Sequence, residues 1–284
     1  MAAGPVVVGV DGSEESLHAV EWAALEARRH RAPLRIVSAP GIPPPTRAYD
    51  ASPQTVVNAL RSAAAWALEA AISRAEEVAP RLLIDTELLA GPPAVAVAGS
   101  GSGALLLVVG ARGAGGFAAM LLGSVSRYAA AHAACPVVAV RDEMAAVHRE
   151  VAVGVRDPDD ATGALGFAFE EAAARTAGLV VVHAWHRLPS PLTGSGEADR
   201  VAAQVGRGLA LALAGWREKY PGVAVRQDVM PGYPARVLAC YSARADLVVI
   251  GRHGGPGKGP AVASVQHALL NHARGPVAIV PAAR

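Results

Sequence analysis

The sequence contains few cysteines and few lysines, and its net charge is close to zero. Its two cysteines, Cys135 and Cys240, occupy unmatched positions in the two halves of the chain and form neither a metal-binding pattern nor a disulfide framework. Lys219 and Lys258 are the only lysines, and the net charge is +2 at pH 7. This balance gives no basis for nucleic-acid binding or for attachment to a membrane surface.

Long apolar runs are also missing. No stretch approaches the roughly 18 apolar residues that a membrane span needs, and the first residues lack the basic and apolar segments of a secretory signal. With so few cysteines, we expect a cytoplasmic protein that does not contact membranes. Of the 284 residues, 52% are hydrophobic and 18% are charged, which is sufficient for the cores of two domains of ordinary size.

Residues 105–126 combine the features of a phosphate-binding turn. An unbroken apolar run at 105–109 is short enough for a strand buried on both faces. Gly110 ends this run, a loop containing Gly113 follows, and Gly123-Ser124 opens a predicted helix. Glycines let backbone N–H groups approach an anion, and the first N–H groups of a helix have no acceptor within it. The pattern is neither a P-loop nor a dinucleotide-binding Gly-x-Gly-x-x-Gly motif.

Strands alternate with helices along the first half. Strands are predicted at 5–10, 34–37, 82–88, 105–109 and 136–140. Helices are predicted at 14–30, at 56–78, from the turn at 91–93 through about residue 100, and at 123–132. This alternation predicts a parallel sheet with right-handed crossovers, whose ligand lies beyond the carboxyl ends of the strands, where the strand order reverses. Asp11, Ala39 and Gly110 lie at the ends of three of these strands and are expected to converge there.

The second half repeats the first. Residues 151–155 match 6–10 at an offset of 145, and Gly251 to Gly254 match Gly110 to Gly113 at an offset of 141. The offset falls to 140 by the start of the next predicted helix. The repeat predicts two domains, 1–142 and 150–284, separated by a short charged linker.

The glycine pattern resembles the nucleotide-binding signature of the ATP-binding branch of the universal stress protein family. The resemblance rests on Gly110-x-x-Gly113, on Gly123-Ser124-Val125-Ser126 after nine further residues, and on the later His132-Ala133 and 135–138. Because the pattern occurs twice, the chain resembles a tandem member over nearly its whole length. The resemblance implies two flavodoxin- or Rossmann-like three-layer α/β/α domains, each with a five-stranded parallel sheet, paired through their last strands.

The resemblance also implies a site for an adenine nucleotide, ATP with Mg²⁺, in the first half. Asp11 would contact the nucleoside end, and Ala39 would meet the adenine through its backbone. The ribose and phosphates would be held by residues of the loop and helix start, with one arginine adding charge: Gly110, Arg112, Gly113, Gly123, Ser124, Val125 and Ser126.

The second half departs from this pattern. Its corresponding residues are Ala184, Gly251, Gly254, Ser264 and Val265. Arg156 replaces the aspartate, and Ala263 stands in place of Gly123, which is unfavourable if that position needs a positive φ or a close backbone approach. The loop before Ala263 is one residue shorter and contains two prolines, which lack N–H donors. We expect a degenerate nucleotide loop in this half, although its lysine can supply a point charge to a phosphate.

The function favoured by the sequence is an ATP-binding regulator or sensor of the stress response. Efficient phosphoryl transfer needs a positioned base, a metal and cationic charge. Asp11, Ser124 and Ser126 are groups that can stand near a metal, but no catalytic base can be named. A slow ATPase or phosphotransferase and a nucleotide-independent interaction module remain alternatives, and a homodimer is compatible with the resemblance. The sequence identifies no protein partner.

Overall fold

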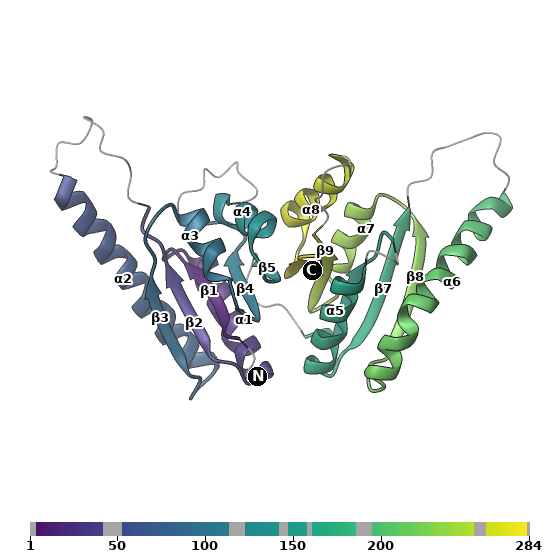
Figure 1. The fold of residues 1–284 in the computed structure, drawn as a ribbon, viewed down its shortest axis with the longest axis horizontal. Coiled ribbons are helices and arrows are strands. Elements are labelled where there is room, and N and C mark those ends of the chain that lie inside the picture. Colours follow the sequence, from purple (N-terminus) through teal and green to yellow (C-terminus); the bar gives the residue numbers. More distant parts are fainter. Residues whose placement is uncertain are drawn as a thin grey trace. The chain divides into compact units, whose positions relative to one another are not determined.

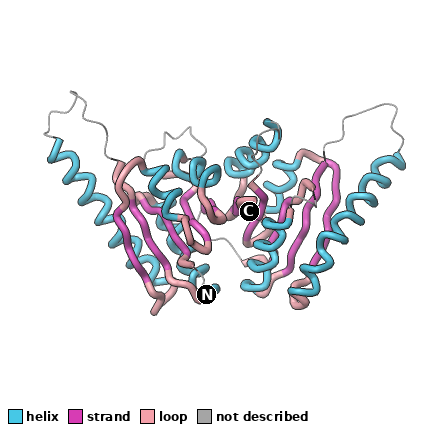
Figure 2. The backbone as a smooth tube through the Cα atoms, viewed as in Figure 1, coloured by secondary structure: helices cyan, strands magenta, loops and turns pink. Residues whose placement is uncertain are grey.

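The computed structural model describes residues 4–41, 53–113, 123–141, 147–157, 161–185, 195–252 and 260–282. The chain divides into two compact units, unit 1 (Met1–Met144) and unit 2 (Ala145–Arg284). In each unit, helices lie against a sheet of parallel strands, as Figure 1 and Figure 2 show. No helix within the described ranges has both the length and the apolar content needed to cross a membrane.

Unit 1 alternates strands and helices throughout its described residues. Its elements are β1 (Val6–Val10), α1 (Glu14–His30), β2 (Leu34–Ser38), α2 (Pro53–Val78), β3 (Ile84–Leu88), α3 (Pro93–Ser100), β4 (Leu106–Gly110), α4 (Ser124–His132) and β5 (Val137–Val140). The strand order is β3-β2-β1-β4-β5, and all neighbours are parallel. Because the crossovers are right-handed, α1 and α2 cover one face of the sheet and α3 and α4 cover the other. Within each pair the two helices are in contact.

Unit 2 repeats this topology. Its elements are β6 (Glu150–Gly154), α5 (Thr162–Arg175), β7 (Gly178–Trp185), α6 (Ser195–Lys219), β8 (Val225–Pro231), α7 (Pro234–Tyr241), β9 (Leu247–Gly251), α8 (Pro260–His272) and β10 (Val277–Val280). The strand order β8-β7-β6-β9-β10 is that of unit 1, again with parallel neighbours. The predicted fold class is therefore confirmed for both units.

The central strands are buried on both faces, as their unbroken apolar runs predict. Val7 in β1 and Leu107 in β4 are both 0% exposed. Helix α1 begins after a turn in which Gly12 has a φ of +83°, and Ser13 Oγ accepts a hydrogen bond from Ser16 N at 3.3 Å. This turn directs the chain from β1 into α1 and leaves the carboxyl end of β1 at the surface.

Several predicted element boundaries differ from the structure by one residue, and two differ by more. Helix α2 begins at Pro53 rather than at residue 56, because proline fits the first helical position, where its missing N–H is not needed. Strand β3 begins at Ile84 rather than at residue 82, because Leu82 N donates to Ala79 O at 3.3 Å in the turn that follows α2. The pairing of the two domains through residues 136–140 and 276–280 stays a prediction.

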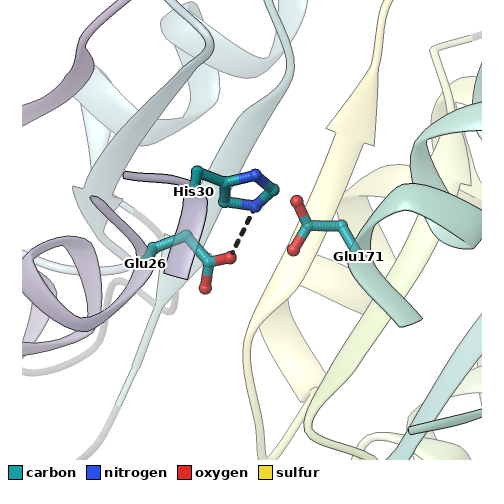
Figure 3. A group of neighbouring side chains, drawn as sticks. All are labelled: Glu26, His30 and Glu171. Atoms are coloured by element: carbon teal, nitrogen blue, oxygen red, sulfur yellow. Dashed lines mark hydrogen bonds and ion pairs between the residues drawn. The ribbon is translucent and has the colours of Figure 1, made fainter. Parts of the chain in front are cut away.

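One helix in each unit buries a carboxylate. Glu26 in α1 is 0% exposed, and Arg29 Nη1 lies 2.9 Å from one of its carboxylate oxygens. His30 Nε2 lies 3.0 Å from the other, as Figure 3 shows. In α5, Glu171 is 1% exposed and pairs with Arg175. A buried carboxylate needs such a partner. The apolar spacing of residues 14–30 did not indicate this carboxylate, but a glutamate followed four residues later by a basic residue in both halves could have done so.

Candidate functional site

The strand order of the sheet in unit 1 reverses between β1 and β4. Strands β2 and β3 lie on one side of β1, and β4 and β5 lie on the other. The connections that leave β1 and β4 therefore separate and open a crevice beyond the carboxyl ends of the two strands. Because β1 and β4 are hydrogen-bonded neighbours with Gly9 opposite Val109, Asp11 and Gly110 reach the same edge of the sheet.

Asp11 is held in a fixed position at this edge. Its Oδ1 accepts hydrogen bonds from Ser13 N at 3.0 Å and from Ser13 Oγ at 2.5 Å. Its Oδ2 lies against Gly113, since a Cβ built on Gly113 would stand 2.4 Å from that oxygen. A glycine at position 113 is what allows the carboxylate to occupy this place. The structure thus brings together two predicted site residues from opposite ends of the unit's sequence.

Gly110 ends β4 in a crowded position. A Cβ at Gly110 would stand 3.0 Å from both Arg112 O and Glu15 O. Further along, Ala111 N donates to Val140 O at 2.6 Å, while Ala111 O accepts from the N–H of Gly123 at 2.8 Å. The first bond ties the start of the glycine loop to β5, and the second ties it to the end of the loop. The side chain of Arg112 is exposed beside them.

Helix α4 opens with Gly123 as its N-cap, and no side chain caps its first turn. Gly123 has a φ of −66°, so this position does not need the left-handed conformation. Close approach is the constraint instead, because a Cβ here would stand 3.2 Å from Ser126 Oγ and 3.4 Å from Ala111 O. At Gly123 it is therefore packing, and not backbone conformation, that favours glycine.

The residues that follow Gly123 differ in orientation. Ser124 is exposed and Val125 is partly buried. Ser126 is 2% exposed, and its Oγ donates to Gly110 O at 2.8 Å and lies 3.2 Å from Ala111 O. The Ser126 hydroxyl thus fastens the helix start to the end of β4. Because this hydroxyl points inward, Ser126 can contact an anion only through its backbone N–H.

Ala39 and Val125 share the apolar side of the same edge. Both pack against one buried cluster that includes Val37 at the end of β2, Val97 in α3 and Val109 in β4. The structure therefore places polar and apolar candidate residues of unit 1 around the carboxyl ends of β1, β2 and β4.

In unit 2, a pocket of about 500 Å³ lies at the carboxyl ends of β6, β7 and β9 and is bordered by α7 and α8. The predicted residues Ala184, Gly251 and Val265 line it. Ser264 belongs to α8, and Gly254 lies outside the described residues. Aliphatic side chains form much of the wall: Val155, Val182, Leu238, Ile250, Val265 and Ala268.

Three polar side chains also line this pocket. Arg156 stands at the position that Asp11 occupies in unit 1, and Tyr233 is 59% exposed at the N-cap of α7. Gln266 takes the place of Ser126, and its Nε2 donates to Gly251 O at 3.3 Å, which repeats the bond from Ser126 to Gly110. Sequence reasoning identified the change to arginine but missed the pocket.

One of the exchanges between the repeats at this pocket replaces a large side chain with a small one. Tyr128 in α4 stacks on His132 with ring centroids 4.1 Å apart. Ala268 and His272 stand 140 residues later, so unit 2 keeps the histidine and replaces the tyrosine with alanine. Comparison of the repeats for side-chain volume, and not only for motif residues, could have indicated the space.

His183 lies near the carboxyl end of β7, and its Nδ1 donates to Val155 O at 3.0 Å. Burial lowers the pKa of His183 below its usual value, although the bond to Val155 and the negative charge of Asp157 act in the opposite direction. The folded chain therefore binds this proton less tightly than the unfolded chain, in which a histidine has a pKa of about 6.5.

We expect this histidine to make unit 2 sensitive to acid. Its contribution to stability is fully present above about pH 6.5 and is lost as the pH falls from there through the lowered pKa of the folded state. His183→Ser copies Ser38 of unit 1, whose hydroxyl donates to Val10 O at 3.0 Å, and should reduce this loss. Urea unfolding of both chains at about pH 7.5 and about pH 5.5 measures the difference. An equal loss in the two chains would contradict the assignment to His183.

Both halves of the chain match the Universal stress protein family, over residues 3–141 and 148–281. A universal stress protein of Mycobacterium tuberculosis is 34% identical over 291 aligned residues, which cover 96% of each chain. Another, from Mycolicibacterium smegmatis, is 33% identical over 285 aligned residues and covers 97% of this chain and 96% of its own. The crystal structure of a universal stress protein from Archaeoglobus fulgidus has the same fold, with a TM-score of 0.70 and 16% identity over 99% of this chain and 97% of that chain. The chain therefore belongs to the universal stress protein family, as a member with two family domains in tandem.

Proposed function

We propose that unit 1 binds an adenine nucleotide, ATP with Mg²⁺, at the carboxyl edge of its sheet. The contact between the Asp11 carboxylate and Gly113 carries this proposal. It joins a fixed hydrogen-bond acceptor to the glycine loop, at the point where the strand order reverses and ligands of open α/β sheets bind.

Each group at this edge has a distinct role in the proposal. The Asp11 carboxylate accepts hydrogen bonds from the nucleoside, and the backbone of Ala39 meets the adenine beside the apolar cluster. Backbone N–H groups of residues 110–113 and of the first turn of α4 hold the phosphates, together with the dipole of that helix. Arg112 adds positive charge, and the exposed hydroxyl of Ser124 is available to the hydration shell of Mg²⁺.

The same groups favour a regulator over an efficient enzyme. Rapid phosphoryl transfer needs a group that orients or deprotonates the nucleophile, in addition to a phosphate cradle. The proposed contacts are backbone N–H groups, the positive charge of Arg112, one carboxylate that accepts hydrogen bonds from Ser13, and one exposed hydroxyl, and the proposal assigns none of them to orient or deprotonate a nucleophile. We therefore propose a cytoplasmic protein whose conformation or assembly, including homodimer formation, responds to bound nucleotide, with slow hydrolysis at most.

Native mass spectrometry of the full chain with and without Mg-ATP tests this proposal. We expect a mass increase of one ATP per chain, and chromatography of the released ligand should identify an adenine nucleotide. The same spectra give the number of chains in the assembly. An unchanged mass in excess Mg-ATP would overturn nucleotide binding and favour an interaction module. Two nucleotides per chain would place a second one in unit 2.

A further inference from the structure

We propose that the pocket of unit 2 binds a small amphiphilic anion, an apolar molecule that carries one carboxylate or sulfonate group. The inference concerns unit 2 alone and does not depend on nucleotide binding by unit 1. Its volume of about 500 Å³ lies within the range of roughly 300–1,000 Å³ that is usual for small-molecule sites.

The wall of the pocket selects an apolar ligand body. Leu238 is 4% exposed and Ile250 is 5% exposed, and both line the pocket together with three valines, one just after β6, one in β7 and one in α8. A chain of several phosphates would bury more charged oxygens against these side chains than Arg156 alone can pair with, which is costly. A hydrocarbon or aromatic body gains free energy from the same contact.

The polar groups of the pocket select one anionic head. Arg156 lines the pocket and offers the planar fork of donors that matches a carboxylate or sulfonate. In unit 1 the same position holds Asp11, which would repel such a head. Gln266 donates through Nε2 to Gly251 O, and the exposed ring of Tyr233 at the rim offers an apolar surface to the ligand.

The exchange of tyrosine for alanine provides the space. Restoring the ring with Ala268→Tyr should fill the pocket while preserving the fold, because unit 1 carries the Tyr128–His132 pair at the corresponding positions and His272 is already present in unit 2. This substitution therefore blocks the site with a side chain that the same fold already accommodates.

Titration of the full chain with the fluorescent sulfonate 8-anilinonaphthalene-1-sulfonate, followed by displacement with decanoate, tests the proposal. We expect one dye molecule to bind to each chain. Decanoate should displace it, and Ala268→Tyr should abolish its binding. Arg156→Gln should lower the affinity for decanoate by about tenfold, since it removes a charge-assisted hydrogen bond. The control Arg207→Gln removes the same charge from an exposed position on α6 outside the pocket lining and should leave both affinities unchanged.

Three results would overturn the proposal. The first is the absence of dye binding to the unaltered chain. The second is unchanged dye binding in both Arg156→Gln and Ala268→Tyr, which would place the dye elsewhere. The third is displacement by Mg-ATP of the dye molecule whose binding Ala268→Tyr abolishes, because the pocket would then be a second nucleotide site.

Discussion

Gly113→Ala is expected to weaken ATP binding to unit 1 by about tenfold or more, equivalent to roughly 1.4 kcal/mol. The new methyl group would stand 2.4 Å from Asp11 Oδ2, well inside contact distance, so the carboxylate has to move. Its movement disturbs the two hydrogen bonds from Ser13, at 3.0 and 2.5 Å, that fix the other oxygen. The acceptor proposed for the nucleoside is then displaced, and titration calorimetry with Mg-ATP measures the loss.

Two further variants separate this effect from general damage. A Cβ built on Gly99 in α3 would have no neighbour within 4 Å outside its own helix backbone, so Gly99→Ala should preserve affinity and stabilise the helix by about 0.5–1 kcal/mol. In a chain that already carries Asp11→Ala, Gly113→Ala should cause little additional loss, because the two residues act as a coupled pair. Full ATP affinity in the Gly113→Ala chain would contradict the proposed role of Asp11.

Most of the fold could be predicted because its signals are local and occur twice. Unbroken apolar runs such as 105–109 indicate buried parallel strands, and the offsets of 145 and 141 residues transfer each element to the second half. The ends of the helices and strands could be predicted less accurately. The start of α2 depended on a proline that can either end a loop or begin a helix, and only the surrounding backbone decides between these roles.

The candidate site was less predictable, because its geometry depends on contacts between distant segments. The glycine pattern indicated the loop, but not that Asp11 Oδ2 lies against Gly113, nor that the hydroxyl of Ser126 turns inward to Gly110 O. The pocket of unit 2 depends on a missing side-chain volume at Ala268. A motif reports which residues are present, whereas a cavity depends on how far the neighbouring side chains reach.

The second large effect is expected in the core of unit 2, where Phe169→Ala should destabilise the unit by about 3–5 kcal/mol. Phe169 in α5 is 0% exposed and stacks on Trp216 in α6 and on Tyr220 just after that helix, with ring centroids 5.9 and 5.7 Å away. Unit 1 has alanines at the three corresponding positions: Ala24 in α1, Ala75 in α2 and Ala79 just after α2, all 0% exposed.

This difference between the units explains why removal of one ring should be costly. In unit 1 the fold lets α1 and α2 pack closely, because alanines occupy the contact. In unit 2, α6 could pack against α5 as closely only if all three rings were removed together. With Trp216 and Tyr220 still in place, α6 stays separated from α5 and the loss of Phe169 leaves a cavity. Urea unfolding followed by tryptophan fluorescence measures the change, and Trp66→Ala, which removes a ring that is 76% exposed, should cost less than about 0.5 kcal/mol. A loss below about 1 kcal/mol for Phe169→Ala would mean that α6 closes the gap despite its two remaining rings.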